Sequence, residues 1–337
     1  MKKSIVLCCL ITHLLIVPTF GQIDMNQKNE DVIVNYLGSF KFNNMQWSFI
    51  INGLLFNTTN LVTKSWKPPS NKQWSEEIGI LFHEGENILE IEGIQLPVEP
   101  EDGSKPYCEL TVYATATDRE TGETDGKVVT HLKLTLDKDG KFTTEESQVF
   151  TNPSVTDSPI LIETNEKTIT DFDWLNNDHI IRRNLYINHT NRDMGWTQAE
   201  VFEETPQNIA KLWIVYDEFT SALTQRDEAT LSKLLRPAAK ERDQYDGYTG
   251  NEERKLGDWM ALIQEGWERR GFTPSKIDRK NYELERATHG KLFRFNYKGG
   301  FNASPIRYDL DDGKSYGTYN FYFTEIDGKI RVGILWF

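Results

Sequence analysis

Histidines are the first side chains to consider for chemistry, because an imidazole can bind a metal ion or act as a general base. Five of the six histidines lie beyond residue 21, without metal-ligand spacing: His83, His131, His179, His189 and His289. The sequence also lacks an HExxH helix, a phosphate-binding glycine loop and a Cys-x-x-Cys pair. It therefore predicts no metal, no cofactor and no catalytic residue, and it favours a protein that is not an enzyme.

The thiol of Cys108 could be a nucleophile if a neighbouring cation lowered its pKa. It lies in the alternating run YCELTVYATA, which is typical of a half-buried strand, and the nearby sequence supplies no such cation. We therefore expect Cys108 to be an inert core residue. The other two cysteines, Cys8 and Cys9, lie near the N-terminus, so the rest of the chain cannot form an internal disulfide.

Residues 1–21 have the features of a secretory signal peptide. Lys2 and Lys3 precede an apolar stretch over residues 5–17, and Gly21 fits a cleavage site. Cys8 and Cys9 lie inside the apolar stretch, too close to Lys3 for lipid attachment. No later segment is apolar enough to span a membrane. The sequence thus predicts a bacterial periplasmic or secreted protein that is not a lipoprotein.

Negative charge is concentrated in the first half of the chain. The net charge is −13, and residues 199–337 hold 23 acidic and 21 basic side chains, so residues 1–198 carry −11. This distribution disfavours nucleic acid and anionic lipid, which both require basic surfaces. It favours solubility or a cationic protein partner.

Residues 30–150 are expected to form an acidic β-sandwich domain. Short β-branched and aromatic runs alternate there with clusters of glycine, proline and asparagine, as in all-β sandwiches. Within it, ILFHEGENILEIEG (residues 80–93) predicts a strand, a tight turn over residues 84–87 and a second strand. This hairpin resembles the GEN hairpins of jelly-roll accessory modules in glycosidases. Residues 151–202 are expected to connect the domains, packing partly on the sandwich and including the strand-like run RRNLYINH.

Beyond residue 203 the apolar period changes from two to about three and a half, which indicates helices. Thr205-Pro206 marks the start of the first helix, and a second is expected near Asp227 and interrupted at Pro237. A third is expected after a capping box of Thr249 and Glu252, ending near Gly271. The leading helix carries Ile209, Leu212, Trp213, Tyr216, Phe219 and Leu223 on one face.

The C-terminal residues predict a β-hairpin around Asp327-Gly328, the composition of a two-residue turn. That turn fixes a register with the pairs Ile326 with Lys329, Phe323 with Val332, Phe321 with Ile334 and Tyr319 with Trp336. One face is then apolar core, and the opposite face is mostly compatible with solvent.

Three helices followed by an antiparallel sheet give an α+β domain over residues 203–337 that resembles the NTF2-like superfamily, with its cystatin-like cone. The resemblance is carried by LWIVYDEFTSALTQRDEATLSKLL and YNFYFTEIDGKIRVGILWF. It implies a curved sheet around the leading helix, with space for a small apolar ligand at the wide end. The candidate pocket-lining residues are Trp213, Tyr216, Phe293, Tyr308, Tyr319 and Trp336.

Isomerases of this superfamily use a carboxylate base and a tyrosine donor in an apolar cavity. The resemblance thus implies Tyr216 as donor, but Asp217 lies about 100° around the helix and should face outward. Glu283 and Asp309 are the other carboxylates weighed, and neither lies in a matching motif. Core packing is the favoured role for Tyr216.

Three functional hypotheses follow. The leading one is an exported, non-catalytic binding protein that contacts another protein, such as an immunity or inhibitor protein neutralising a secreted toxin. The second is an NTF2-like ligand-binding or isomerase/cyclase-type domain attached to a carbohydrate-binding sandwich. The third is a structural protein of the cell envelope.

Overall fold

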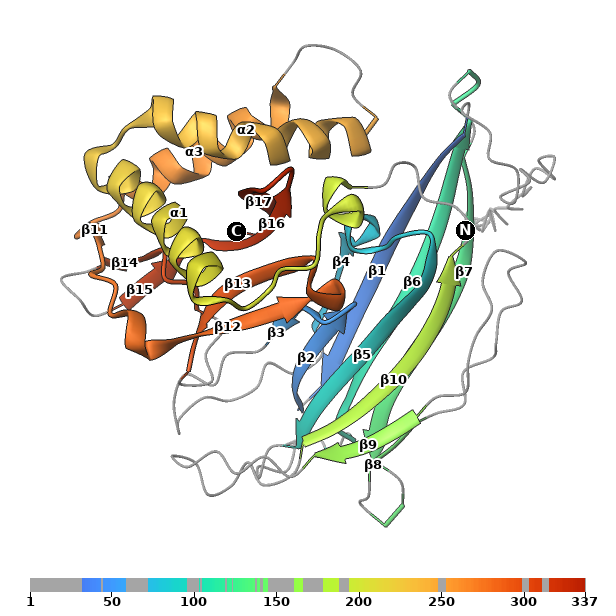
Figure 1. Ribbon diagram of the computed structural model, residues 1–337. Helices are drawn as coiled ribbons and strands as arrows, with labels where there is room; N and C mark the ends of the chain where they lie inside the picture. The colour runs from blue at the N-terminus through green and yellow to red at the C-terminus, as the bar shows by residue number, and fades with distance from the viewer. Residues whose placement is uncertain are drawn as a thin grey trace, which may run out of the picture.

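The computed structural model describes most of the chain beyond residue 31. The described residues are 32–58, 72–95, 103–118, 120–144, 161–165, 178–187, 194–247, 253–298, 303–310 and 315–336, without 44, 104, 123, 137, 140 and 141. The predicted signal peptide and the predicted capping box of Thr249 and Glu252 lie outside these residues. The fold is rich in β-structure, with four sheets, and its three helices lie in the C-terminal half (Figure 1).

The N-terminal half contains two five-stranded antiparallel sheets. The first has the order β4 (Lys72–Glu77), β1 (Val32–Asn43), β6 (Tyr107–Asp118), β7 (Thr124–Leu136) and β8 (Phe142–Thr144). The second has the order β3 (Leu54–Thr58), β2 (Met45–Ile51), β5 (Gly85–Gln95), β10 (Asp178–Ile187) and β9 (Leu161–Asn165). The strand predicted from RRNLYINH is thus found in β10, where it pairs with β5 and β9.

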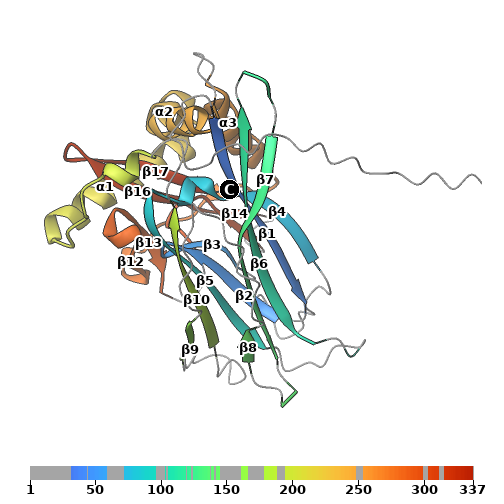
Figure 2. The same cartoon turned by 90° about the vertical axis from the view of Figure 1, so that its right-hand side faces the viewer.

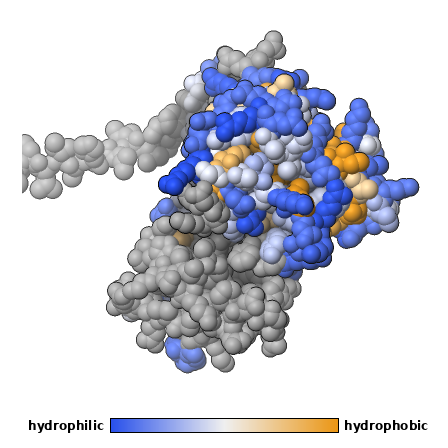
Figure 3. All heavy atoms as spheres, turned by 90° about the vertical axis from the view of Figure 1, so that its left-hand side faces the viewer, coloured by the Kyte–Doolittle hydropathy of each residue, from blue (hydrophilic) through white to orange (hydrophobic). Residues whose placement is uncertain are grey.

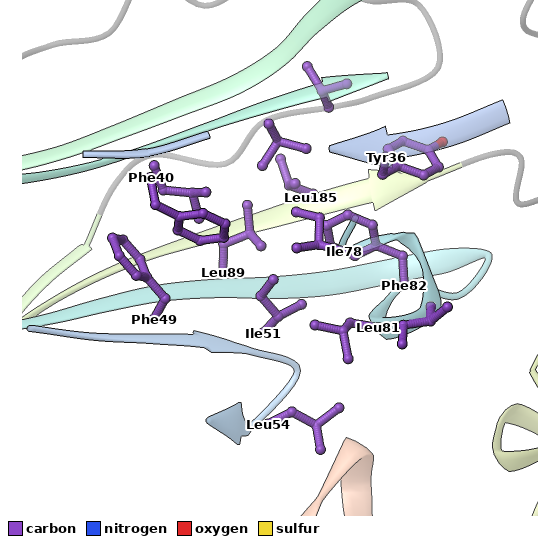
Figure 4. Packing of buried hydrophobic residues seen from close by; sticks show 14 of the residues in the cluster. Tyr36, Phe40, Phe49, Ile51, Leu54, Ile78, Leu81, Phe82, Leu89 and Leu185 are labelled. Carbon is purple, nitrogen blue, oxygen red and sulfur yellow. The ribbon is translucent and has the colours of Figure 1, made fainter. Parts of the chain in front are cut away.

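Figure 2 shows the strands of these sheets from the side. A continuous apolar core fills the space between the sheets, and Figure 4 shows part of its packing. Phe40 of β1 meets Phe49 of β2 edge to face, with ring centroids 4.7 Å apart, and Trp74 of β4 stacks on Phe40 at 5.0 Å. Cys108 is fully buried and its thiol lies 3.1 Å from the sulfur of Met45. Burial raises the pKa of the Cys108 thiol, so the prediction of an unreactive core residue is confirmed.

The predicted strand over residues 80–83 is wrong. Residues Gly79–Leu81 form a 3₁₀ turn, η1, closed by a hydrogen bond from Phe82 N–H to the Gly79 carbonyl at 3.0 Å. Every side chain from Ile78 to Phe82 is buried, and this uniform burial explains why the run has the composition of a strand. The predicted turn over residues 84–87 is wrong as well, because Gly85 to Asn87 already belong to β5 and pair with β10. Only the second strand of the predicted hairpin is found.

The C-terminal half begins with three helices, α1 (Pro206–Gln225), α2 (Glu228–Tyr245) and α3 (Arg254–Glu268). As predicted, Thr205 caps α1 and Pro206 is its first residue, and Asp227 caps α2 by accepting from Thr230 N–H at 3.0 Å. The predicted interruption at Pro237 is wrong. The helix continues through it, because Leu235, Ala238 and Ala239 are buried on either side of the proline and tie that stretch to the core.

Two small sheets follow the helices. One has the order β11 (Thr273–Pro274), β14 (Arg307–Leu310) and β15 (Ser315–Thr318), and the other β12 (Tyr282–Ala287), β13 (Leu292–Tyr297), β16 (Asn320–Ile326) and β17 (Lys329–Trp336). Helix α1 packs on the four-stranded sheet, where Tyr216 meets Phe323 at 5.0 Å and Phe219 meets Phe321 at 4.7 Å. The predicted contact between the leading helix and the closing hairpin is thus confirmed.

The hairpin register is as predicted from Ile326–Lys329 to Phe323–Val332 and differs beyond that point. A bulge leaves Gly333 without a partner, so Tyr322 pairs with Ile334 and Asn320 with Trp336. Alternation alone would place Val332 and Ile334 on one face. The bulge instead sends Val332 to the helical core and Ile334 to the core of the sandwich.

The expectation of a solvent-compatible reverse face is therefore wrong as well. That face of the four-stranded sheet packs against the N-terminal half, and Tyr322, Thr324 and Ile334 on it are all buried. The sheet thus lies between the helices on one side and the sandwich on the other (Figure 1).

Candidate functional site

The surface between the two halves is held by a buried asparagine network. The side-chain amide of Asn52, in the turn between β2 and β3, donates to the Leu81 carbonyl at 2.7 Å and to Asn87 Oδ1 at 2.8 Å. Its Oδ1 accepts from Ile88 N–H at 2.8 Å, and its carbonyl accepts from Thr288 N–H at 2.8 Å. The network joins both halves of the molecule. Because the donors and acceptors of the Asn52 side chain have hydrogen-bonding partners, burying this polar residue carries little cost.

A second polar cluster lies on the sandwich-facing side of the C-terminal sheet. Arg294 has no exposed surface, and its Nε and Nη2 donate to the two oxygens of Glu285 at 3.1 and 3.0 Å. The guanidinium also lies over the ring of Tyr322, 4.4 Å from its centroid. This bidentate pair orients three side chains inside the junction, and none of them lines either of the pockets described next.

The first pocket opens where β4, η1, α2, α3 and β17 meet, and we call it the Glu76 pocket. Its volume is about 270 Å³. It is lined by Glu76, Glu77, Ile80, Met194, Ala238, Arg242, Lys255, Trp259, Gly333, Ile334 and Leu335. Apolar side chains thus form most of the wall, and four charged groups lie on it.

The charged groups on this wall form a chain of ion pairs. Arg242 contacts Glu77 Oε2 and Asp246 Oδ1, each at 2.9 Å, and Lys255 contacts Asp246 Oδ2 at 3.2 Å. The N–H of Gly79 donates to the other oxygen of Glu77 at 3.1 Å. Burial raises the pKa of Glu77, and the nearby Arg242 partly opposes that shift.

Glu76 differs from these groups because it has no ion pair with a described residue. Glu76 is exposed as a residue, and the protein on one side of its carboxyl group removes enough solvent to raise its pKa. The indole of Trp74 is its hydrogen-bonding partner, and Arg242 acts only as a more distant charge. A partly desolvated carboxylate with a neutral partner is stabilised by an additional cation.

The second pocket also has lining residues from both halves, and we call it the Lys291 pocket. Its volume is about 230 Å³. Three stretches of chain line it: the residues before β5, the turn η2 (Gly195–Gln198) and the turn η4 (Thr288–Gly290) with Lys291. Trp196 of η2 is buried and donates its indole N–H to the Ile80 carbonyl at 3.3 Å, which fixes η2 against the sandwich.

Large apolar side chains exposed on the described surface belong to separate elements. They are Tyr113, Val201, Ile214, Leu262 and Tyr316. On the face drawn in Figure 3, hydrophilic residues cover most of the coloured surface and hydrophobic residues form separate patches. The two pockets are therefore better candidate sites than a flat apolar face.

The predicted pocket-lining residues lie in the helical core. Trp213, Tyr216, Phe293 and Tyr319 are buried there and Tyr308 is partly buried, whereas the side chain of Trp336 lies outside the described residues. None of the five residues whose side chains the structure describes lines either pocket. Their role as ligand contacts stays a prediction.

Tyr216 packs with Trp213, Phe295 and Phe323, and its hydroxyl accepts from Phe295 N–H at 3.0 Å. Burial raises the pKa of this hydroxyl. Asp217 is exposed, as its helical position predicts, and pairs with Arg279 at 2.6 Å. This arrangement uses Tyr216 as a core residue that anchors β13.

The described residues contain no cluster of three or more histidine, cysteine or acidic side chains able to hold a metal ion. The sequence predicts no Gly-x-Ser-x-Gly elbow, although residues 313–317 match the motif in their residue types. Ser315 begins strand β15 and pairs with Leu310, whereas an elbow places its serine in a turn from strand to helix.

None of the charged residues of the Glu76 pocket is among the residues predicted from the sequence. Glu77 and Arg242 are 165 positions apart, and no local spacing connects them. The only local signal was the adjacent pair Glu76-Glu77 ahead of a buried apolar run.

No protein-family model matches the chain, and no curated protein or solved structure was found to be similar to it. The NTF2-like resemblance therefore stays a prediction from sequence. Among the described helices, none combines the length and the apolar character that crossing a membrane requires.

Proposed function

We propose that this protein is an exported, non-catalytic binding protein that recognises a cationic protein partner, and that the Glu76 pocket receives a lysine or arginine side chain of that partner. The observation that carries the proposal is the carboxylate of Glu76, which is partly desolvated and has no ion pair with a described residue. An incoming ammonium or guanidinium group would supply the missing positive charge.

The wall of the pocket suits a basic side chain better than a compact ion. Ile80, Met194 and Ile334 can cover an aliphatic stem while the charged group reaches Glu76. The volume of about 270 Å³ is below the roughly 300–1,000 Å³ typical of sites for drug-sized ligands. It suits a single side chain from a larger partner.

The net negative charge of the N-terminal half also favours a cationic protein partner. Residues 1–198 carry 11 of the 13 net negative charges, and β4, which bears Glu76, belongs to that half. A field of this sign raises the rate at which a cationic protein approaches. The proposed location outside the cytoplasm rests on the predicted signal peptide.

An immunity or inhibitor role against a secreted cationic toxin is the specific form of this proposal that we favour. The finer fold assignment, an NTF2-like domain over residues 203–337, is part of it and is supported by the packing of α1 on the closing hairpin. An isomerase-type site beside Tyr216 and a purely structural envelope role stay alternatives that no specific contact favours.

The test uses short peptides that present one basic side chain. We expect a fluorescent pentapeptide with a central lysine to bind at least about tenfold more tightly than the same peptide with norleucine, since a charge-assisted contact contributes about 1.5–3 kcal/mol. Glu76→Gln should remove this preference, and Glu218→Gln, which deletes an exposed carboxylate on α1, should preserve it. Equal binding of both peptides to the wild-type protein contradicts the proposal.

A further inference from the structure

Lys291 is the one lysine on the wall of the second pocket, and it is half-buried. Its ammonium group donates to the carbonyl oxygen of Thr197 in η2. It forms no ion pair within the part of the chain that the structure describes. A carbonyl oxygen orients an ammonium group without neutralising it, so the pocket contains a fixed positive charge that lacks a counter-ion.

His83 is held rigidly at the edge of the same pocket. Its Nδ1 lies 2.7 Å from the Glu84 carbonyl, and because a carbonyl only accepts, Nδ1 carries the proton. Its backbone N–H donates to Asn87 Oδ1 at 3.1 Å, and the Asn87 amide donates back to the His83 carbonyl at 2.8 Å. With Nδ1 as the donor, Nε2 is the accepting nitrogen of the ring, so it suits a donor group of a ligand and not an anionic oxygen.

His289 reaches the pocket from an unusual turn. Thr288, His289 and Gly290 have φ values of 51°, 56° and 86°, and a β-branched residue such as threonine rarely adopts this region. Thr288 N–H donates to the Asn52 carbonyl at 2.8 Å, and Phe202 N–H donates to the Gly290 carbonyl at 2.9 Å. These contacts hold the turn in place and put His289 and Lys291 on one wall.

The polar groups of the pocket are mainly donors. Lys291, the imidazole of His289 and the amide of Gln198 can donate there, and Glu84 supplies one carboxylate. We propose that the Lys291 pocket binds a single oxyanion group, a carboxylate or a phosphate, with Lys291 as its charged partner and His289 as a hydrogen-bonding partner. Because the Glu84 carboxylate repels additional negative charge, the site should favour a monoanion, such as acetate or the singly charged form of phosphate.

The site would connect both halves of the molecule, since His83 precedes β5 of the sandwich and Lys291 precedes β13. An anion bound there stabilises the junction by mass action, because it binds only when the three stretches are assembled. The proposal is independent of the proposed function: the two pockets share no lining residue, and the ligands have opposite charge.

The test is calorimetric titration of the full chain with inorganic phosphate and with acetate, against chloride at the same ionic strength. We expect both oxyanions to bind at one site and Lys291→Met to weaken binding about tenfold or more. The matched control is Lys280→Met, which deletes an exposed lysine paired with Asp278. It should leave the affinity unchanged.

A second variant and a peptide comparison complete the experiment. If Lys291→Met fails to fold, His289→Gln keeps the contact between Lys291 and Thr197 and should weaken binding about threefold or more. A peptide with a free C-terminal carboxylate, compared with its amide, separates a chain end from a small-molecule anion as the source. No binding of phosphate, acetate or the peptide, or equal binding by wild type and Lys291→Met, overturns the proposal.

Discussion

The carbonyl oxygen of Asn52 accepts a hydrogen bond from the backbone N–H of Thr288, at 2.8 Å. Asn52 lies in the β2–β3 turn of the sandwich, and Thr288 lies in the left-handed turn before β13. One backbone contact thus joins segments more than two hundred residues apart, and the side chain of Asn52 extends it to Asn87 and Leu81. Both pockets lie along this junction, so its rigidity determines their geometry.

Asn87 is the most sensitive member of this network. Asn87→Ala leaves His83 N–H and the Asn52 amide without their partner in a buried site, so we expect a loss of about 2–4 kcal/mol in the free energy of unfolding. Urea unfolding measures it. The control is Asn184→Ala, whose amide donates to the exposed carboxylate of Glu86 and should change stability by less than about 1 kcal/mol. Comparable losses in both variants would contradict a special role for the network.

Glu76→Gln is expected to stabilise the free protein at neutral pH while it removes binding of the lysine peptide. The folded protein raises the pKa of Glu76, so its ionised form opposes folding at a pH above the folded pKa. That cost falls as the pH drops and vanishes below the ordinary value of 4.5, where both states are protonated. Urea unfolding at pH 7 and pH 4 should therefore show a difference that shrinks on acidification. A Glu76→Gln variant less stable than wild type at pH 7 would sink this account.

For Glu109 we expect the opposite dependence of stability on pH, because its pKa is lowered in the folded protein. A hydrogen bond from His131, assisted by Lys41 at 3.2 Å, lowers the pKa of Glu109 from 4.5 to about 2. Its contribution to stability is complete above about pH 4.5 and is lost as the pH falls through about 2. Glu109→Gln should thus destabilise the protein at pH 5, and the difference from wild type should disappear near pH 2. A difference that does not depend on pH would be incompatible with this pairing.

Gly333 and Gly257 should respond in opposite ways to alanine. A methyl group on Gly333 would lie 2.8 Å from Leu292 Cδ2 and 3.2 Å from Thr324 Cβ, so Gly333→Ala should cost about 1–3 kcal/mol. Gly257 lies in α3 with no atom within 4 Å of the added carbon, and Gly257→Ala should gain about 0.5–1 kcal/mol. Thermal unfolding of the two variants measures both signs. A tolerated Gly333→Ala would contradict the packing at the bulge.

Helix caps and turns could be predicted from the sequence, because their structure depends on neighbouring residues. The caps of α1 and α2 at Thr205 and Asp227, and the hairpin turn at Asp327-Gly328, follow from residue type and short spacing. The bulge at Gly333 could not be predicted, because it exists to place Ile334 against a sandwich core built from distant residues. The error about the reverse face of that sheet has the same cause.

The candidate sites could not be predicted from the sequence for a similar reason: their residues are far apart in the chain. Tyr216 was identified by its helical period, and it packs in the core as the favoured interpretation required. Glu76 comes from β4 of the sandwich, whereas Arg242 and Lys255 come from α2 and α3 of the C-terminal half, so the contact between the halves brings them together. Their charges matter because of desolvation, which no spacing of residues reveals.

The most direct test of the central claim is the titration of the Glu76 carboxyl group by NMR, in the free protein and with the lysine peptide bound. We predict a pKa above 4.5 in the free protein, and a decrease in that pKa when the ammonium group supplies the missing charge. A Glu76 pKa at or below 4.5 in the free protein, or one that the peptide leaves unchanged, would contradict it.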